Sequence, residues 1–269
     1  MKMGTAKQQG GRQEYHVPAL EKGFAILEYL SRNSAGRTHA DISNELGQSR
    51  TTVYSILCNL ESMGYIRKGD DGNYYLGLGL YSLGMSAAYQ VRKSAMLNPD
   101  ITSLRNDLGL TVHVCGYSNG ETICLEKLDG IGGIVFKSYI GERKPLHLSA
   151  SGKAILAYLP QSEFDQYISG PLSVRTRNSL STLKQLIDCR SQILTDGFSV
   201  DDEEGEAGVF CFGVPIFSMG GALFGAISIS AIKSSIDVVT YGRYTRRIIQ
   251  TGEAISRRLG YTGEYPLIC

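Results

Sequence analysis

Hydrophobic residues in the first third of the chain recur with the spacing of short helices. After Pro18, a residue type favoured at the first position of a helix, apolar side chains return every three or four positions. These positions are Leu20, Phe24, Leu27 and Leu30. We therefore expect a helix that begins near Pro18 and ends at the polar segment 31–36.

Capping residues mark the next two helices. Thr38 followed by Asp41 has the spacing of a capping box and predicts a short helix over residues 40–46. Ser49 is a candidate N-cap for a third helix, which Gly64 ends. The apolar side of this third helix carries Val53, Ile56, Leu57 and Leu60. Its opposite side carries small hydrogen-bonding side chains instead of the Glu/Lys mixture of an ordinary solvated helix.

A hairpin follows these helices. Strands are predicted at 65–68 and 74–76, around the turn sequence Gly-Asp-Asp-Gly-Asn at 69–73. A helix, a short helix, a turn, a polar-faced helix and a hairpin in this order predict a winged helix-turn-helix. The alternative is another small helical domain with a trailing hairpin.

The remainder of the chain predicts blocks of strands and helices. Helices are expected at 78–91, 97–108, 151–159, 161–168, 180–195 and 239–259, and strands at 111–117, 122–128, 134–140, 198–201, 209–217 and 222–230. Asn119-Gly120 is a strong hairpin turn between two of these strands. The fold class is therefore α+β with a mainly antiparallel sheet. We divide the chain into a flexible tail (1–17), a winged helix-turn-helix (18–77), a linker helix (78–96) and an effector-binding and oligomerisation domain (97–269).

Composition narrows the function less than the pattern does. The chain has 269 residues, 42% of them hydrophobic and 20% charged, which suits two globular domains. No apolar run approaches the roughly 18 residues of a membrane span, and no signal sequence is visible, so we expect a cytoplasmic protein. The net charge is only +1, so DNA binding has to be argued from pattern. The six cysteines and four histidines lack metal-ligand spacing, and we expect free thiols, no metal and no cofactor.

Two sets of motifs resemble the IclR family of bacterial transcription regulators. The N-terminal set is Ala-Leu-Glu-Lys-Gly (19–23), Ser-Arg-Thr-Thr-Val-Tyr (49–54), Gly-Tyr-Ile (64–66) and Tyr-Tyr-Leu-Gly (74–77). The C-terminal set is Leu-His (146–147), Ala-Ser-Gly-Lys-Ala-Ile-Leu (150–156), Asp-Asp-Glu-Glu (201–204), Gly208, Cys211, Pro215 and Ala-Ile-Ser-Ile-Ser (226–230). The resemblance implies a winged helix, a linker helix and an effector domain in a dimer or tetramer that binds palindromic operators, more often as a repressor. Ser55 stands where the family commonly has arginine and Arg50 replaces a lysine, so no operator sequence is carried over.

The candidate DNA-binding residues lie at the start of the third helix and in the wing. They are Ser49, Arg50, Thr51, Thr52, Tyr54, Ser55 and Lys68. Residues near the N-terminus of a recognition helix reach base edges in the major groove. Arg50 can read a guanine or hold a phosphate, and Ser49 has the alternative role of a cap alone.

The candidate effector-binding residues come from separate strands and one helix start. They are Ala150, Ser151, Asp201, Cys211, Ser228 and Ser230, and the family resemblance points to the same segments. Ser228 and Ser230 share one side of a strand, and the N–H groups of a helix start suit an anion. Because the only formal charge in this set is that of Asp201, we expect a small hydroxy, keto or sugar acid with its carboxylate at the helix start and a hydroxyl near Asp201. The alternative is that the serines bond only backbone or solvent and that Cys211 is a core residue.

The leading functional hypothesis is a one-component DNA-binding transcription regulator of a catabolic operon, controlled by this small carboxylate effector. The runner-up is a small hydrolase or lyase in which Cys211 or Cys124 works with His113 or His147. A third reading is a ligand-binding protein that acts through protein partners alone.

Overall fold

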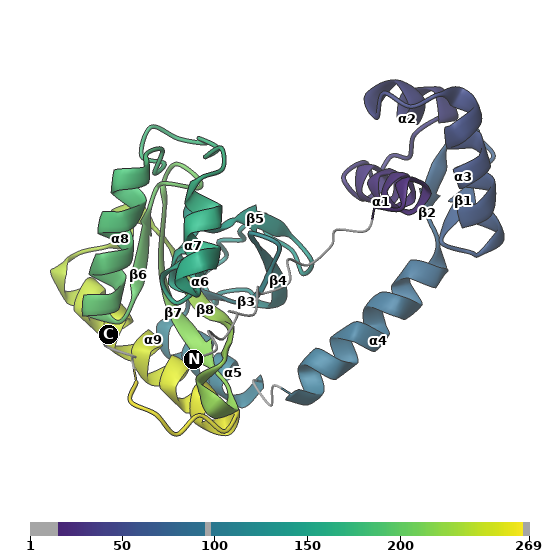
Figure 1. Cartoon of the computed structure of the whole chain (residues 1–269). Coiled ribbons are helices and arrows are strands. Elements are labelled where there is room, and N and C mark those ends of the chain that lie inside the picture. The colour runs from purple at the N-terminus through teal and green to yellow at the C-terminus, as the bar shows by residue number, and fades with distance from the viewer. Residues whose placement is uncertain (1–15, 95–97, 266–269) are drawn as a thin grey trace, which may run out of the picture. The chain divides into compact units, whose positions relative to one another are not determined.

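The computed structural model describes residues 16–94 and 98–265, and these divide between residues 89 and 90 into two compact units (Figure 1). Most of the expected tail, residues 1–15, lies outside the described residues. Helix α4 (Leu78–Ser94) contains the boundary between the two units. Among the described helices, none is long and apolar enough to cross a membrane.

The N-terminal unit is a winged helix-turn-helix, as predicted. Its elements are α1 (Pro18–Ser31), α2 (His39–Glu45), α3 (Arg50–Ser62), β1 (Ile66–Lys68) and β2 (Tyr74–Leu76). Thr38 and Asp41 form the expected capping box, and the Ser49 hydroxyl accepts from the backbone N–H of Thr52. The helices and the wing enclose one buried cluster: Ile26, Leu30, Ile42, Val53, Leu57, Ile66 and Tyr74.

The C-terminal unit is built on one antiparallel sheet of six strands in the order β5-β4-β3-β8-β7-β6. The strands are β3 (Thr111–Ser118), β4 (Glu121–Leu128), β5 (Arg143–Pro145), β6 (Ser199–Asp202), β7 (Val209–Phe217) and β8 (Leu223–Ile232). The helices are α5 (Asn98–Leu108), α6 (Ala150–Ala157), α7 (Gln161–Ile168), α8 (Leu183–Asp196) and α9 (Val238–Arg258). Short 3₁₀ turns lie at Leu146–Leu148, Met219–Gly221 and Lys233–Ser235. The predicted α+β class with an antiparallel sheet is confirmed.

The two faces of this sheet are covered by different helices (Figure 1). Helices α5 and α9 pack on one face through apolar side chains such as Phe212, Ile229 and Ile248. Helices α6, α7 and α8 form a second cluster on the other side, around Ile155, Leu186 and Ala226. On this second face, the helices therefore cover only part of the sheet. The uncovered part of the sheet carries polar side chains.

The strand expected at 134–140 is wrong. This segment has no regular structure, and the edge strand is instead β5, immediately downstream. Its apolar side chains are exposed, by 50% at Ile134 and 70% at Val135. Hydrogen bonds from side chains fix this segment, in place of the backbone hydrogen bonds of a sheet. Lys127 Nζ donates to the carbonyl of Phe136 (2.8 Å), and Ser138 Oγ lies 2.7 Å from His113 Nε2. The prediction was wrong because it used the hydrophobicity of the segment alone, whereas a strand also needs a neighbouring strand to pair with.

Candidate DNA-binding and effector-binding sites

The start of α3 and strand β1 present the predicted DNA-binding residues to solvent. Val53 and Leu57 are fully buried in the core of the N-terminal unit, which turns the opposite side of the helix outward. All the predicted residues are exposed except Thr52, which is half-buried: Ser49, Arg50, Thr51, Tyr54, Ser55 and Lys68. The Thr52 hydroxyl lies 2.8 Å from that of Ser49, the group that caps the helix by accepting from the Thr52 N–H.

His39 positions the start of α3, a role that our sequence reading missed. Its Nε2 lies 2.8 Å from the carbonyl oxygen of Arg50, and its ring meets that of Tyr54 edge-on with centroids 6.0 Å apart. Because His39 is the first residue of α2, this contact sets one helix against the other. In the sequence, the only local indication of this role is that His39 directly follows the helix cap Thr38.

The wing carries its cations over aromatic rings. The Lys68 ammonium lies 5.5 Å from the ring centroid of Tyr74, and the Arg67 guanidinium lies 4.4 Å from that of Tyr75. Both cations are on exposed residues of β1. Arg67 is a second candidate phosphate contact that the sequence did not single out.

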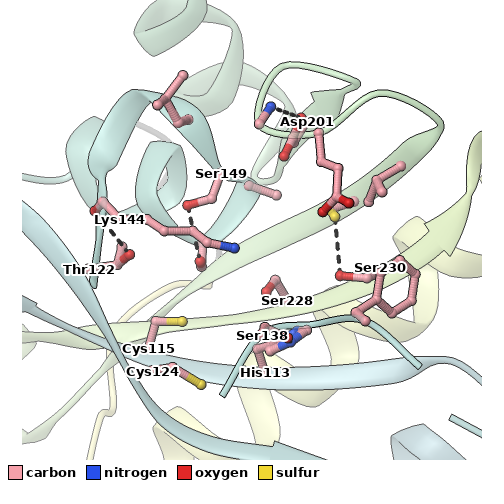
Figure 2. Close-up of a pocket in the computed structure, with 18 of the residues that line it drawn as sticks. His113, Cys115, Thr122, Cys124, Ser138, Lys144, Ser149, Asp201, Ser228 and Ser230 are labelled. Carbon is pink, nitrogen blue, oxygen red and sulfur yellow. Dashed lines mark hydrogen bonds between the residues drawn. The ribbon is translucent and has the colours of Figure 1, made fainter. Parts of the chain in front are cut away.

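All six predicted effector residues line a single cavity of about 370 Å³ in the C-terminal unit (Figure 2). A volume of this size suits a small organic molecule. The structure therefore brings together Ala150, Ser151, Asp201, Cys211, Ser228 and Ser230, which are spread over 81 positions of the chain, from 150 to 230.

Strand register explains why these side chains meet. Asp201 is paired with Cys211, Cys211 with Ser230, and Ser230 with Thr111, across β6, β7, β8 and β3. Directly opposite residues of an antiparallel sheet point to the same face. A parallel row two residues further along pairs Ser228 with His113. The members of these rows that line the cavity form its polar floor: Asp201, Cys211, Ser230, Ser228 and His113. The row between them, Phe212, Ile229 and Val112, faces the apolar core.

Helix α6 begins directly above this floor. Ser149 caps it by accepting from the N–H of Gly152 at 3.1 Å, and the Ser199 hydroxyl donates to the carbonyl of Ala150 at 2.6 Å. A side chain at Gly213 would overlap the Ala150 carbonyl, so this glycine permits the close approach of helix and sheet. The backbone N–H groups of the first helical turn have no intrahelical partner.

Asp201 is buried, and its carboxylate is hydrogen-bonded to the backbone of the loop that follows it. One carboxylate oxygen accepts from the N–H of Glu204 at 2.8 Å, and burial raises the pKa of this carboxyl above its usual range. Below it, Lys153 and Glu204 form a buried ion pair that anchors the loop after β6. Burial likewise raises the pKa of Glu204, while the Lys153 ammonium opposes that shift.

The cavity holds more charge than we expected from the sequence. Lys144 and Arg175 also line it, so the expectation of a single negative charge was wrong. Lys144 comes from β5, the strand that our reading missed, and its Nζ lies 3.3 Å from Glu142 Oε2. Figure 2 shows the Lys144 side chain reaching across the cavity towards Ser149. Other polar lining residues that sequence reasoning did not assign are His113, Thr122, Lys137, Ser138, Glu142 and Glu206.

The cysteine and histidine pairs that an enzyme would need do not form among the described residues. The neighbour of Cys211 Sγ is Ser230 Oγ at 3.2 Å, and burial raises the pKa of this thiol to about 12. His113 contacts Ser138, and burial together with nearby lysines lowers its pKa to about 4. His147 is held between Tyr167 and the carbonyl of Ser173. Within the described ranges, no cluster of three or more His, Cys, Asp or Glu side chains could hold a metal ion.

A winged helix with an outward polar recognition face, followed by a domain with a polar cavity, defines a DNA-binding transcription regulator with an effector domain. Two family models match the sequence: the IclR helix-turn-helix domain over residues 19–70, and the bacterial transcriptional regulator IclR C-terminal domain over residues 87–257. The chain belongs to the IclR family, whose members are transcription regulators and not enzymes.

Known relatives align along nearly the whole chain. The DNA-binding transcriptional repressor YiaJ of Escherichia coli is 29% identical over 259 residues, covering 93% of this chain and 92% of YiaJ. The IclR crystal structure from Thermotoga maritima is 28% identical, with a TM-score of 0.67, and covers 91% of this chain and 100% of that one. An IclR homologue from Microbacterium hydrocarbonoxydans, solved with 4-hydroxybenzoate, shares the fold at 19% identity and a TM-score of 0.76, covering 91% and 100% of the two chains.

Proposed function

We propose that this protein is a repressor of a catabolic operon that is released from or retained on its operator by a small organic acid bound in the cavity of the C-terminal unit. The observation that carries this proposal is the cavity itself, where six residues predicted from separate segments converge around about 370 Å³. The repressor YiaJ among its relatives supports the sign of regulation.

The chemistry of the lining favours an anionic effector that also carries oxygen substituents. Lys144 and Arg175 supply positive charge, and the start of α6 at Ala150 supplies backbone N–H donors. Asp201 would repel a carboxylate placed against it but accepts from a hydroxyl. We therefore place the acid group near Lys144 and α6, and a hydroxyl or keto oxygen towards Ser228, Ser230 and Asp201.

A thermal-shift screen of the full chain tests this effector class. The panel contains hydroxy acids, keto acids, sugar acids and 4-hydroxybenzoate, the molecule bound to the Microbacterium homologue, each beside its neutral amide. An acid that raises the melting temperature while its amide does not supports the proposal, because ligands that bind only the folded state stabilise it. Stabilisation by the amides alone would refute it.

Lys144→Met sharpens the screen. Removing this ammonium should abolish the preference for the acid over its amide, whereas Lys184→Met, an exposed lysine on α8, should leave the preference unchanged. A retained preference in Lys144→Met would move the acid group elsewhere in the cavity.

We also propose that the protein acts as a homodimer or homotetramer. An apolar stripe at helical spacing lies exposed along α4: Leu78, Tyr81, Met85 and Tyr89. Burying such a stripe against a second copy is favourable, and two recognition helices are needed for a palindromic operator. Sedimentation of the unaltered chain should show an oligomer, and a monomer would contradict the proposal. The double variant Tyr81→Glu with Met85→Glu should dissociate the oligomer. Ala87→Glu, on the opposite side of the helix, should leave it intact.

Regulation then requires that the effector bind the two arrangements of the oligomer with different affinity. The test is gel retardation of an operator fragment, selected from random duplexes, with and without the acid found in the screen. An effector that binds but leaves operator affinity unchanged would refute control by this cavity.

A further inference from the structure

Two cysteines face each other across neighbouring strands at the cavity floor. Cys115 on β3 is the register partner of Cys124 on β4, and both side chains line the cavity. They are only 6% and 5% exposed, so the cavity is their route to solvent. The two thiols interact, since each shifts the pKa of the other, and Figure 2 shows them on neighbouring strands of the cavity floor. The Cys124 thiol itself donates to the carbonyl oxygen of Glu126 at 3.5 Å.

The backbone pairing of these two residues favours a cross-strand disulfide. The N–H of Cys124 donates to the carbonyl of Glu142 at 2.9 Å, and its carbonyl accepts from the N–H of Gly141 at 2.7 Å. Both backbone groups of Cys124 therefore point away from β3, which makes Cys115 and Cys124 a non-hydrogen-bonded pair. In such pairs the Cα atoms lie about 4.5 Å apart. Disulfides form at Cα separations of about 4.4–6.8 Å, a range that includes this regular spacing. The register of the two strands shifts by one residue on the other side of the pair, between Val114 and Cys115.

The surroundings activate one thiol of the pair. Hydrogen bonds from the Cys124 thiol and then the Ser151 hydroxyl, together with the Lys144 ammonium, lower the pKa of the Cys115 thiol against the effect of burial. The same interaction raises the pKa of Cys124. A thiol with a lowered pKa beside a second thiol is the usual arrangement of a redox-sensing cysteine and its resolving partner. Among the described residues, the neighbour of Cys211 in the same cavity is Ser230, whose hydroxyl cannot resolve an oxidised sulfur, and burial raises the pKa of the Cys211 thiol to about 12.

We propose that Cys115 and Cys124 form a reversible disulfide when a small peroxide enters the cavity. The Cys115 thiolate attacks a peroxide oxygen; an S–O bond forms, the O–O bond breaks, and the departing hydroxide takes a proton to become water. The Cys124 sulfur then attacks the Cys115 sulfenic sulfur, and the hydroxyl leaves as water with the Cys124 proton. The two thiols lose two electrons in total, and the peroxide gains them. This chemistry does not depend on which effector the cavity binds.

Peptide mapping of the full chain after treatment with hydrogen peroxide tests the disulfide directly. Trypsin leaves both cysteines on one peptide, residues 106–127, because the flanking cleavage sites are Arg105 and Lys127. Cleavage after Glu121 then separates Cys115 from Cys124. We expect the two fragments to stay joined after peroxide and alkylation of the remaining thiols, and to separate on reduction. Exposed Cys58 reports the peroxide dose, since its oxidation needs no cavity access.

Variants distinguish a resolving pair from two independently oxidised thiols. Cys124→Ser should abolish the joined product and leave a Cys115 sulfenic acid that dimedone traps, whereas Cys211→Ser should form the joined product as the unaltered chain does. Both fragments fully alkylated at a dose that oxidises Cys58 would overturn the proposal. So would sulfinic acid on either cysteine without any joined product.

Discussion

The two candidate sites are built in opposite ways. The recognition face of α3 consists of exposed side chains that project from one helix, with Tyr54 56% exposed. The effector cavity consists of buried side chains from several strands and a helix start, with Asp201 and Ser228 each 5% exposed. An exposed side chain can be removed without disturbing its neighbours, whereas a buried polar group leaves its partner unsatisfied. Removing a polar side chain from α3 should therefore change binding without changing stability. Removing one from the cavity of the C-terminal unit should change both.

The largest difference is expected at the buried ion pair beneath the cavity. Glu204→Gln leaves the Lys153 ammonium buried without its counter-charge and should lower the free energy of unfolding by about 3–5 kcal/mol. Arg50→Ala on α3 should change it by less than about 0.5 kcal/mol. Urea unfolding followed by circular dichroism measures both. Glu206→Gln, exposed on the same loop, is the matched control and should behave like Arg50→Ala; equal stability of the two glutamine variants would break the comparison.

The next largest effect is a pH dependence that belongs to the cavity. Because the pKa of His113 falls from 6.5 to about 4 on folding, the unfolded chain binds its proton first as the pH drops. Stability is therefore lost between about pH 6.5 and pH 4, by about 2 kcal/mol at pH 5 and about 3 kcal/mol in total. Urea unfolding at pH 7 and pH 5 should show this loss in the unaltered chain and a reduced loss in His113→Gln. Identical pH dependence in both proteins would contradict the burial argument.

Arg50 should affect DNA binding without affecting folding. If Arg50 reads a base pair, Arg50→Ala weakens operator binding by about 1–3 kcal/mol, and random duplex binding changes much less. A phosphate contact would weaken both and reduce the salt dependence. Gel retardation over a salt series measures this, with Arg32→Ala at the end of α1 as the control. Unchanged binding to both duplexes would remove Arg50 from the interface.

The smallest effects concern the two serines on the cavity floor. Ser228→Ala and Ser230→Ala should each weaken binding of the acid effector by about 0.5–2 kcal/mol, because each removes one hydrogen-bonding hydroxyl. Operator affinity without effector should stay as in the unaltered chain, as should effector affinity in Ser181→Ala, an exposed control. Calorimetry on the variants decides this. If both alanine variants bind the effector normally, the ligand lies elsewhere.

Elements defined by local signals were predictable. The capping box at Thr38, the cap at Ser49 and the Asn119-Gly120 turn all lie where the sequence predicts them, because each depends on residues within a few positions. The error at 134–140 arose because a strand needs a partner as well as apolar residues. The strand available for pairing was β4, and β4 pairs with residues 143–145 instead of with 134–140.

Local periodicity was enough to predict which side of α3 faces solvent, because the 100° step of a helix places Arg50, Thr51 and Tyr54 relative to the buried Val53 without any long-range contact. The sequence also indicated six cavity residues, through the two-residue period of a strand and the family motifs. Long-range strand pairing, in contrast, brings Lys144 into that cavity and places Cys115 opposite Cys124. The physical reason is register: which side chains meet across a sheet depends on how strands distant in the chain align, and a shift of one residue would turn each of them to the opposite face.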